Sequence, residues 1–356
     1  MLEQQIQSFA ASQVDLDIKI EYKTVNGEGG TLSYLRTGRS IAPTILPDLI
    51  VLRMNQLETA VSDELIFPLN GMVASDLLED LFPVALDYAI QSEQILGYPF
   101  ALTNLTHFAY NTTTISDTIA TNWEMFRAIN NGSFVFPANG EGGATLILQM
   151  YLSANGSLTN EVGQTTLAVE PLALSLEQLN LARNDGFLVR QSNSLTSFNE
   201  VWAVFENGSA NIALIDSKTF MAMRSNLPDT AVSPIPGLEN DTIPLVNGWA
   251  WAISTNEPDH RALAAALLNQ LIAPEQLAAW SLQTNHLPAR RTAFAFWPED
   301  DPYAQFVQAQ LEQAESHPFA PGSDVLKTLR TTVFNVVNLT ETPQEAAESA
   351  AISINP

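Results

Sequence analysis

The chain has 356 residues, 46% of them hydrophobic, and its 15 Lys and Arg residues stand against 39 Asp and Glu residues, which gives a formal net charge of −24 at pH 7. This length and composition suit two globular domains and exclude a disordered chain. The acidic balance disfavours partners such as nucleic acid and anionic lipid. The absence of cysteine excludes disulfides, thiol catalysis and cysteine-based metal sites.

The first fifty residues predict the start of an α/β sheet. Leu2, Ile6 and Phe9 share one helical face, and the alternating segment 17–22 predicts a strand with one buried face. The glycine-rich segment 27–30 is expected to be a loop. The continuous apolar run 49–52 is typical of a strand that is buried on both faces of a parallel sheet.

The rest of the chain alternates predicted helices and strands, and its last third is mainly helical. Thr121 and Asn122 are placed to cap a helix that begins at Trp123. Further strands are expected over 95–101, 211–215 and 249–253, an extended connector over 228–244, and helices over 77–90, 146–152, 172–182, 198–205, 258–272, 274–284, 303–314, 324–337 and 343–352.

No local motif for catalysis or for a cofactor is evident. The chain has no nucleophile elbow, phosphate-binding loop or calcium loop, and the glycine-rich segment 140–143 lacks the lysine of a nucleotide site. The four histidines are scattered, which disfavours a histidine-based metal site. Paired carboxylates such as Glu79 and Asp80 are expected on the solvated surface. We therefore expect neither an enzyme nor a bound cofactor.

A series of short motifs, taken together and in their order along the chain, is more informative than any single motif. In chain order it comprises PDLIV from Pro47, PLN from Pro68, LGYP from Leu96, YN from Tyr110, TNW from Thr121, FENGSA from Phe205, GWAWAI from Gly248 and LPAR from Leu287. This series resembles the family 1 extracellular solute-binding proteins of ABC importers, the group that includes maltose-binding protein. The chain departs from the family pattern at Asn211 and Ile212, where the family has Ala-Met, and it shows no counterpart of the family's first strand before Leu2.

The resemblance implies an α/β protein with the two-lobed type II periplasmic-binding-protein fold and a ligand cleft between the lobes. Lobe 1 is expected to comprise residues 1–109 and 252–298, and lobe 2 residues 110–251 and 299–356. Because ligands of open α/β sheets bind at the ends of strands, the site is expected there, with hinge closure around the solute.

Ten residues are predicted to contact the solute. Trp249 follows Gly248, whose missing side chain would let the backbone approach a ligand, and is expected to stack on the apolar face of a sugar; Trp251 points to the same side but is favoured as core. The other eight are polar and, except for Arg330, follow predicted strands: Asn55, Gln56, Thr103, Asn104, Asp216, Ser217, Lys218 and Arg330.

The resemblance also implies a function, the delivery of a small solute, expected to be a mono- or oligosaccharide, to the permease subunits of an ABC transporter. We expect a monomer that acts in the periplasm or as a cell-surface lipoprotein, with a signal segment upstream of Met1. Three alternatives remain at this point: the same fold binding a non-sugar solute such as a polyamine, phosphate ester or metal chelate; a hydrolase or transferase that uses scattered carboxylates; and a sensor or structural protein.

Overall fold

The computed structural model describes residues 1–25, 30–42, 45–116, 119 and 122–355, and the chain divides into two compact units. Unit 1 comprises Met1–Thr103 and Val246–Ala314, and unit 2 comprises Asn104–Leu245 and Glu315–Pro356. Each unit has its own sheet and its own helices. The predicted strands 49–52 and 211–215 lie in different sheets, as expected for two α/β lobes.

The sheet of unit 1 is built around the long strand β9 (Leu245–Ile253). Strand β1 (Leu49–Arg53) and strand β4 (Tyr98–Thr103) pair with β9 on either side, both antiparallel to it. β1 and β4 therefore run in the same direction and end at the same edge of the sheet. β10 (Leu287–Pro288) pairs with β4 on its other side, and β2 (Ile90–Gln91) and β3 (Gln94–Ile95) form a separate small hairpin.

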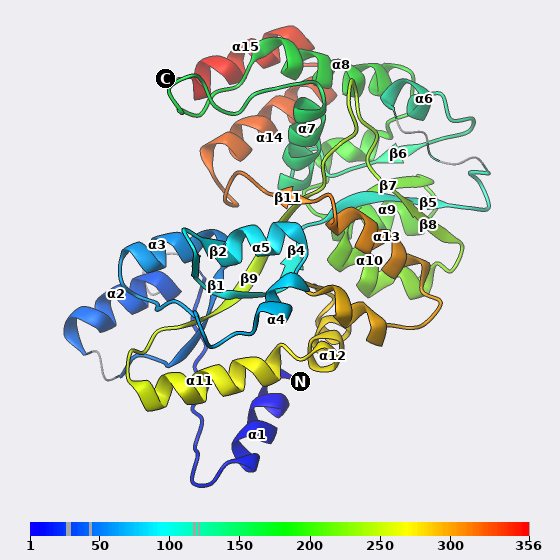
Figure 1. Ribbon diagram of the computed structural model, residues 1–356. Helices are drawn as coiled ribbons and strands as arrows, with labels where there is room; N and C mark the ends of the chain where they lie inside the picture. The colour runs from blue at the N-terminus through cyan, green and yellow to red at the C-terminus, as the bar shows by residue number, and fades with distance from the viewer. Residues whose placement is uncertain (26–29, 43–44, 117–118, 120–121, 356) are drawn as a thin grey trace. The chain divides into compact units, whose positions relative to one another are not determined.

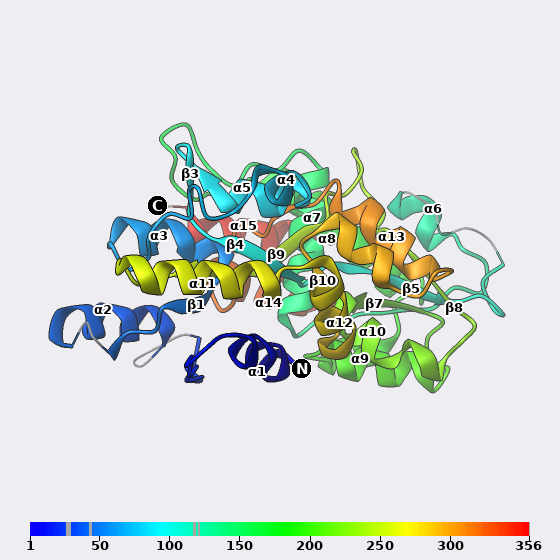
Figure 2. The same ribbon diagram turned by 60° about the horizontal axis from the view of Figure 1, so that its bottom comes forward.

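Helices of unit 1 come from both of its chain segments. α1 (Leu2–Ser12) packs against α11 (Pro258–Leu271), and the two lie side by side in Figures 1 and 2. A side-chain hydrogen bond from Gln5 Nε2 to the carbonyl oxygen of Gln276, 3.0 Å long, also connects the two segments. The remaining helices are α2 (Thr31–Ile41), α3 (Leu57–Ser62), α4 (Ser75–Glu79), α5 (Pro83–Ala89), α12 (Pro274–Thr284) and α13 (Pro302–Leu311).

In unit 2, β7 (Ile212–Asp216) lies between β5 (Thr106–Asn111) and the short strand β6 (Phe134–Val135), and β8 (Thr230–Ser233) pairs with β5. Helices α7 (Glu141–Ser153), α8 (Val169–Asn184), α14 (Asp324–Val337) and α15 (Pro343–Ile354) pack together on one side of this sheet. α9 (Phe198–Glu206) and α10 (Ser217–Met223) lie on the other side, and α6 (Trp123–Arg127) packs against α8 (Figure 1).

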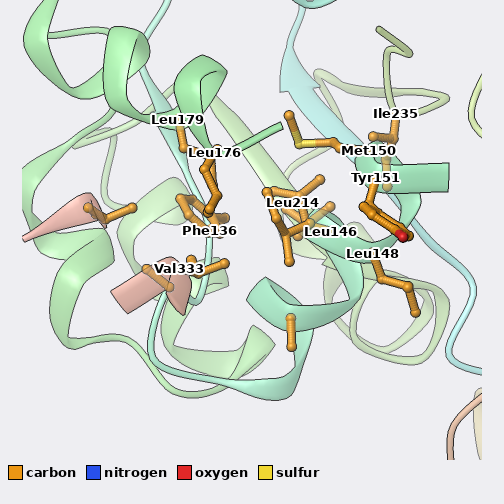
Figure 3. Close-up of a cluster of buried hydrophobic side chains, with 14 of the residues drawn as sticks. Phe136, Leu146, Leu148, Met150, Tyr151, Leu176, Leu179, Leu214, Ile235 and Val333 are labelled. Carbon is orange, nitrogen blue, oxygen red and sulfur yellow. The ribbon is translucent and has the colours of Figure 1, made fainter. Parts of the chain in front are cut away.

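The core of unit 2 forms where α7 meets the sheet and the C-terminal helices. α7 is apolar on nearly all sides, and its side chains contact residues of α8, α14 and β7 in one cluster (Figure 3). A helix that is buried all round needs apolar partners on every side. The C-terminal segment supplies some of them, which explains why Glu315–Pro356 belongs to unit 2 although unit 1 precedes it in the chain.

The boundaries between the two units fall at other residues than those predicted from the sequence. The predicted boundaries lay after residues 109, 251 and 298, whereas the structure changes unit after Thr103, Leu245 and Ala314. Strand pairing accounts for the first two of these boundaries, because most residues of β5 and β9 pair with strands of a single unit. β5 belongs wholly to unit 2, β9 pairs with two strands of unit 1, and α13 stays with unit 1.

Two strand predictions are corrected by the structure. Segment 17–22 forms no strand, although Ile18 and Ile20 are half-buried between exposed neighbours. The run 49–52 was predicted to be a strand of a parallel sheet with both faces buried. Its bonded neighbour β9 is antiparallel, and only Ile50 and Leu52 are fully buried, so one face is better covered than the other. The predicted loop 27–30 and the predicted cap at Thr121 lie outside the described residues, except for Gly30.

Candidate functional site

Four side chains line one face of the unit 1 sheet at the edge where β1 and β4 end. Arg53, the last residue of β1, is paired directly with Trp249 of β9, and Thr103, the last residue of β4, is paired with Asn247. Directly paired residues share a face of the sheet, as do alternate residues along a strand. Arg53, Thr103, Asn247 and Trp249 are all half-buried. This edge therefore presents a charged, an aromatic and two polar side chains together.

Arg53 and Trp249 are in direct contact. The guanidinium carbon lies 5.3 Å from the centroid of the Trp249 ring, a typical cation–π distance. On the other side of Trp249 the neighbouring strand contributes Ala101, which is paired with it. The Nε of Arg53 is buried and has no hydrogen-bond partner among the described residues.

The loop after β1 continues this edge. Asn55 is exposed and Gln56 is half-buried in the short 3₁₀ turn Met54–Gln56. The Gln56 Oε1 accepts a hydrogen bond of 3.2 Å from the backbone N–H of Arg53, which fixes the turn at the end of the strand. The structure thus brings the predicted residues Asn55, Gln56, Thr103 and Trp249 to one end of the unit 1 sheet.

Gly248 has a structural explanation that differs from the predicted one. A Cβ atom at this position would lie 2.6 Å from the carbonyl oxygen of Ala101 and 2.6 Å from the terminal methyl carbon of Met54. Glycine is therefore needed for close packing of β9 on β4 and Met54, and no ligand is required to account for it.

Trp251 lies deeper in the sheet than Trp249. Only 6% of its surface is exposed, and its ring stacks on Phe100 with 5.1 Å between the centroids. Phe100 in turn meets Trp280 edge-on. This aromatic cluster leaves Trp251 little surface for a solute, in line with the interpretation of this residue as core.

In unit 2, the predicted residues around β7 meet the start of β5. Asp216 ends β7 opposite Thr106, and its carboxylate accepts a 3.0 Å hydrogen bond from the Thr219 N–H, so that it caps α10. Burial raises the pKa of Asp216 above its ordinary value. The backbone N–H of Ser217 donates to the carbonyl oxygen of Leu105, and the Ser217 side chain is buried. Asp216 and Ser217 thus serve the local structure.

The remaining predicted residues of unit 2 are exposed. Asn104 precedes β5 in the left-handed conformation, with φ 66°, and lies next to Leu105, whose carbonyl binds Ser217. Lys218 is exposed at the start of α10. Arg330 lies exposed on α14, which packs against α7, α8 and α15, and among the described residues no hydrogen bond or ion pair joins it to Asp216 or Lys218.

Sequence reasoning missed two residues of the unit 1 edge, Arg53 and Asn247. Arg53 directly follows the apolar run 49–52 and is not among the ten predicted residues. Asn247 lies two positions before Trp249 on the same strand. Because alternate residues of a strand share a face, the reasoning that put Trp249 and Trp251 on one side also puts Asn247 there. Its strand partner Thr103 is itself a predicted site residue.

The arrangement at this edge is suited to binding a small solute. In the described part of the chain there is no group of three or more acidic or histidine side chains that could hold a metal ion. Nor is any described helix long and apolar enough to cross a membrane. Half-buried aromatic and amide groups at a strand edge offer an apolar face and hydrogen-bonding groups to a small solute.

Comparisons with known proteins agree in fold and in family. The family model of bacterial extracellular solute-binding proteins matches residues 4–308. The sugar-binding protein MalE of Xanthomonas citri superposes with a TM-score of 0.76 at 17% identity, over 99% of this chain and 93% of that one. Maltose-bound MalE3 of T. maritima gives 0.72 at 16% identity, over 99% and 95%. The GacH receptor of Streptomyces glaucescens, solved unliganded and with acarbose, gives 0.72 at 13% identity, over 98% and 92%. No curated protein matches the chain in sequence.

Proposed function

Since the chain belongs to the bacterial extracellular solute-binding proteins, we propose that its solute is a mono- or oligosaccharide, which it delivers to the permease of an ABC transporter. Membership of this family establishes that the protein binds a solute. The family and the fold expected from the sequence are both confirmed. The observation that carries the sugar assignment is the set of similar structures, which includes proteins bound to maltose and to acarbose.

The unit 1 edge supports this assignment chemically. A pyranose presents C–H groups on its faces and hydroxyl groups around its rim, and it is held well by an aromatic ring flanked by amide and hydroxyl side chains. Trp249 supplies the ring, and Asn55, Asn247 and Thr103 supply the polar groups. We include Gln56 among the candidates at this edge and give Trp251 a packing role. In unit 2, considered by itself, the candidates are Asn104, Asp216, Ser217, Lys218 and Arg330.

We propose further that the protein acts as a monomeric carrier without catalytic turnover. Its family and its structural relatives are binding proteins. The extracellular family indicates a location outside the cytoplasm, and attachment to the membrane as a lipoprotein is part of the same proposal.

A thermal-shift screen tests the sugar assignment. The purified chain is heated with neutral sugars, acidic sugars, amino acids, polyamines and phosphate esters. A ligand present at 100 times its dissociation constant stabilises the folded state by about 2.7 kcal/mol. At least one sugar is expected to raise the melting temperature, with the affinity then measured by calorimetry. A shift caused only by a non-sugar class contradicts the assignment.

A further inference from the structure

Arg53 carries a charge that no described residue neutralises. It makes no ion pair or side-chain hydrogen bond in the described part of the chain, and its guanidinium lies against the face of the Trp249 ring. The residue is half-buried at the end of β1, so water solvates its charge only in part. A buried N–H without an acceptor is unfavourable, and more so when the group is charged.

Five other buried or half-buried arginines donate hydrogen bonds to acceptors within the protein, although the Nε atoms of Arg127 and Arg261, like that of Arg53, have no partner among the described residues. Arg290 binds Asp80 at 2.6 Å, Arg291 binds Glu312 at 2.6 Å, and Arg127 binds Asp185 at 2.7 Å. Arg183 and Arg261 donate to backbone carbonyl oxygens at 3.2 and 2.9 Å. Unlike these five arginines, Arg53 donates neither to a carboxylate nor to a backbone carbonyl oxygen of the described residues, and it lies beside the candidate binding residue Trp249.

We propose that Arg53 determines specificity by pairing with a carboxylate of the bound solute, so that the preferred carbohydrate is an acidic sugar. This inference rests on the proposed function, and it names the class of sugar. The planar guanidinium matches a carboxylate with two parallel hydrogen bonds. The ring of Trp249 restricts the guanidinium on one side and so helps to orient it.

A neutral sugar would satisfy this site less completely. A hydroxyl group can accept a hydrogen bond from Arg53, but it leaves the positive charge without a counter-ion. A carboxylate supplies both an acceptor and the opposite charge. Since Asn247, Thr103 and Asn55 remain available for hydroxyl groups, a uronic acid fits the combination of groups at this edge.

The test compares neutral sugars with their uronate counterparts, galactobiose and digalacturonate among them, by calorimetry on the full chain. The native protein is expected to bind a uronate at least tenfold more tightly than its neutral counterpart. Arg53→Gln should abolish this preference and change the affinity for the neutral sugar only a few-fold. Arg53→Lys should keep part of it, because lysine retains the charge but not the planar fork.

Arg190→Gln is the matched control, since Arg190 is exposed in the 3₁₀ segment Arg190–Ser194 of unit 2 and its loss removes the same charge. The control should leave the preference unchanged, and the melting temperature of each unliganded variant checks its folding. Equal affinities of the native protein for both sugar types, or an equal loss for both in Arg53→Gln, would overturn the inference.

Two further outcomes separate this inference from the proposed function. If neutral sugars bind and uronates do not, the acidic-sugar inference is wrong, but the assignment of a sugar as the solute is retained. Absence of any sugar binding sinks both. A simple dicarboxylate, glutarate, is included as a probe without a sugar ring. If glutarate binds through Arg53 while no sugar does, Arg53 pairs with a carboxylate, but the acidic-sugar inference and the sugar assignment are both wrong.

Discussion

Among the tryptophans of the unit 1 sheet, Trp249 differs from Trp251 in having surface to offer a ligand. Trp249→Ala should weaken sugar binding about ten- to a hundredfold, because an aromatic platform contributes roughly 1–3 kcal/mol through burial of its apolar face. The melting temperature of the unliganded protein should fall only modestly, since the side chain is half-buried. Calorimetry and thermal melting on the same variant measure both quantities.

Trp251→Ala provides the matched comparison on the same strand. Its ring is 6% exposed and stacked on Phe100, so truncation should cost stability of roughly 3–5 kcal/mol through loss of core packing. If Trp249→Ala lowers the melting temperature as much as Trp251→Ala and leaves the affinity intact, Trp249 is a core residue and the stacking proposal fails.

Asp216 is expected to make the stability of the protein depend on pH. Burial raises its folded pKa above the ordinary value of 3.8. A group with a raised folded pKa contributes stability that is full below its unfolded pKa and is lost as the pH rises through the folded pKa. The amide side chain of the variant Asp216→Asn cannot ionise, and its oxygen can still cap α10.

Asp216→Asn should therefore be at least as stable as the native protein at pH 7, with a difference that disappears near pH 3.5. Each unit of pKa shift corresponds to about 1.4 kcal/mol. Melting temperatures of both proteins between pH 3.5 and 8 measure the effect. A variant that is clearly less stable at pH 7 and equal at pH 3.5 would show that the ionised carboxylate stabilises the fold instead.

At the scale of elements, α9 begins with a capping box formed by Ser197 and Glu200. Ser197 accepts a hydrogen bond from the Glu200 N–H, while the Glu200 carboxylate accepts one of 3.0 Å from the Ser197 N–H. Ser197→Ala should lower the free energy of unfolding by about 1 kcal/mol, and Ser197→Gly by only a few tenths. Urea unfolding measures both. Equal stability of Ser197→Ala and the native protein would mean that the cap contributes nothing.

Helices such as α9, α12 and α14 could be predicted closely because their signals are local. Proline lies at the first position of α12, and α14 has the predicted bounds of 324–337. α2 was missed, since its interior includes Gly38 and several β-branched or hydroxyl residues that lower helix propensity. Segment 17–22 has the alternation of a strand but no bonded partner, and periodicity alone supplies no partner.

The candidate site shows the same division between local and long-range information. The sequence could place the candidate residues Asn55, Gln56 and Thr103 at the ends of β1 and β4, which meet at one edge of the sheet. The pairing of Arg53 with Trp249 could not, since it depends on the register of two strands that are far apart in the sequence. The same holds for Thr103 and Asn247. Register was therefore the missing information for the contact of Arg53 with Trp249, whereas alternation along β9 could have placed Asn247 on the face of Trp249.

At the scale of the whole molecule, a formal charge of −24 opposes the approach of an acidic sugar. Arg53 would have to attract the carboxylate locally against a repulsive field from the rest of the protein. These two effects differ in range. At 10 mM salt the Debye length is about 30 Å, so distant carboxylates repel the solute, whereas at 150 mM it is about 8 Å and only near charges act.

The association rate of a uronate should therefore rise a few-fold when the salt concentration is raised from 10 to 150 mM, because screening removes the long-range repulsion before it weakens the contact with Arg53. Stopped-flow tryptophan fluorescence measures this rate, and the neutral counterpart of the sugar serves as control, with a rate that should not depend on salt. In Arg53→Gln the uronate should still associate faster at higher salt, because the net charge that repels it is nearly unchanged, while its affinity stays low. A uronate association rate that falls as salt is added would show that attraction, rather than repulsion, governs the approach, and would contradict this account of how the acidic molecule captures an acidic ligand.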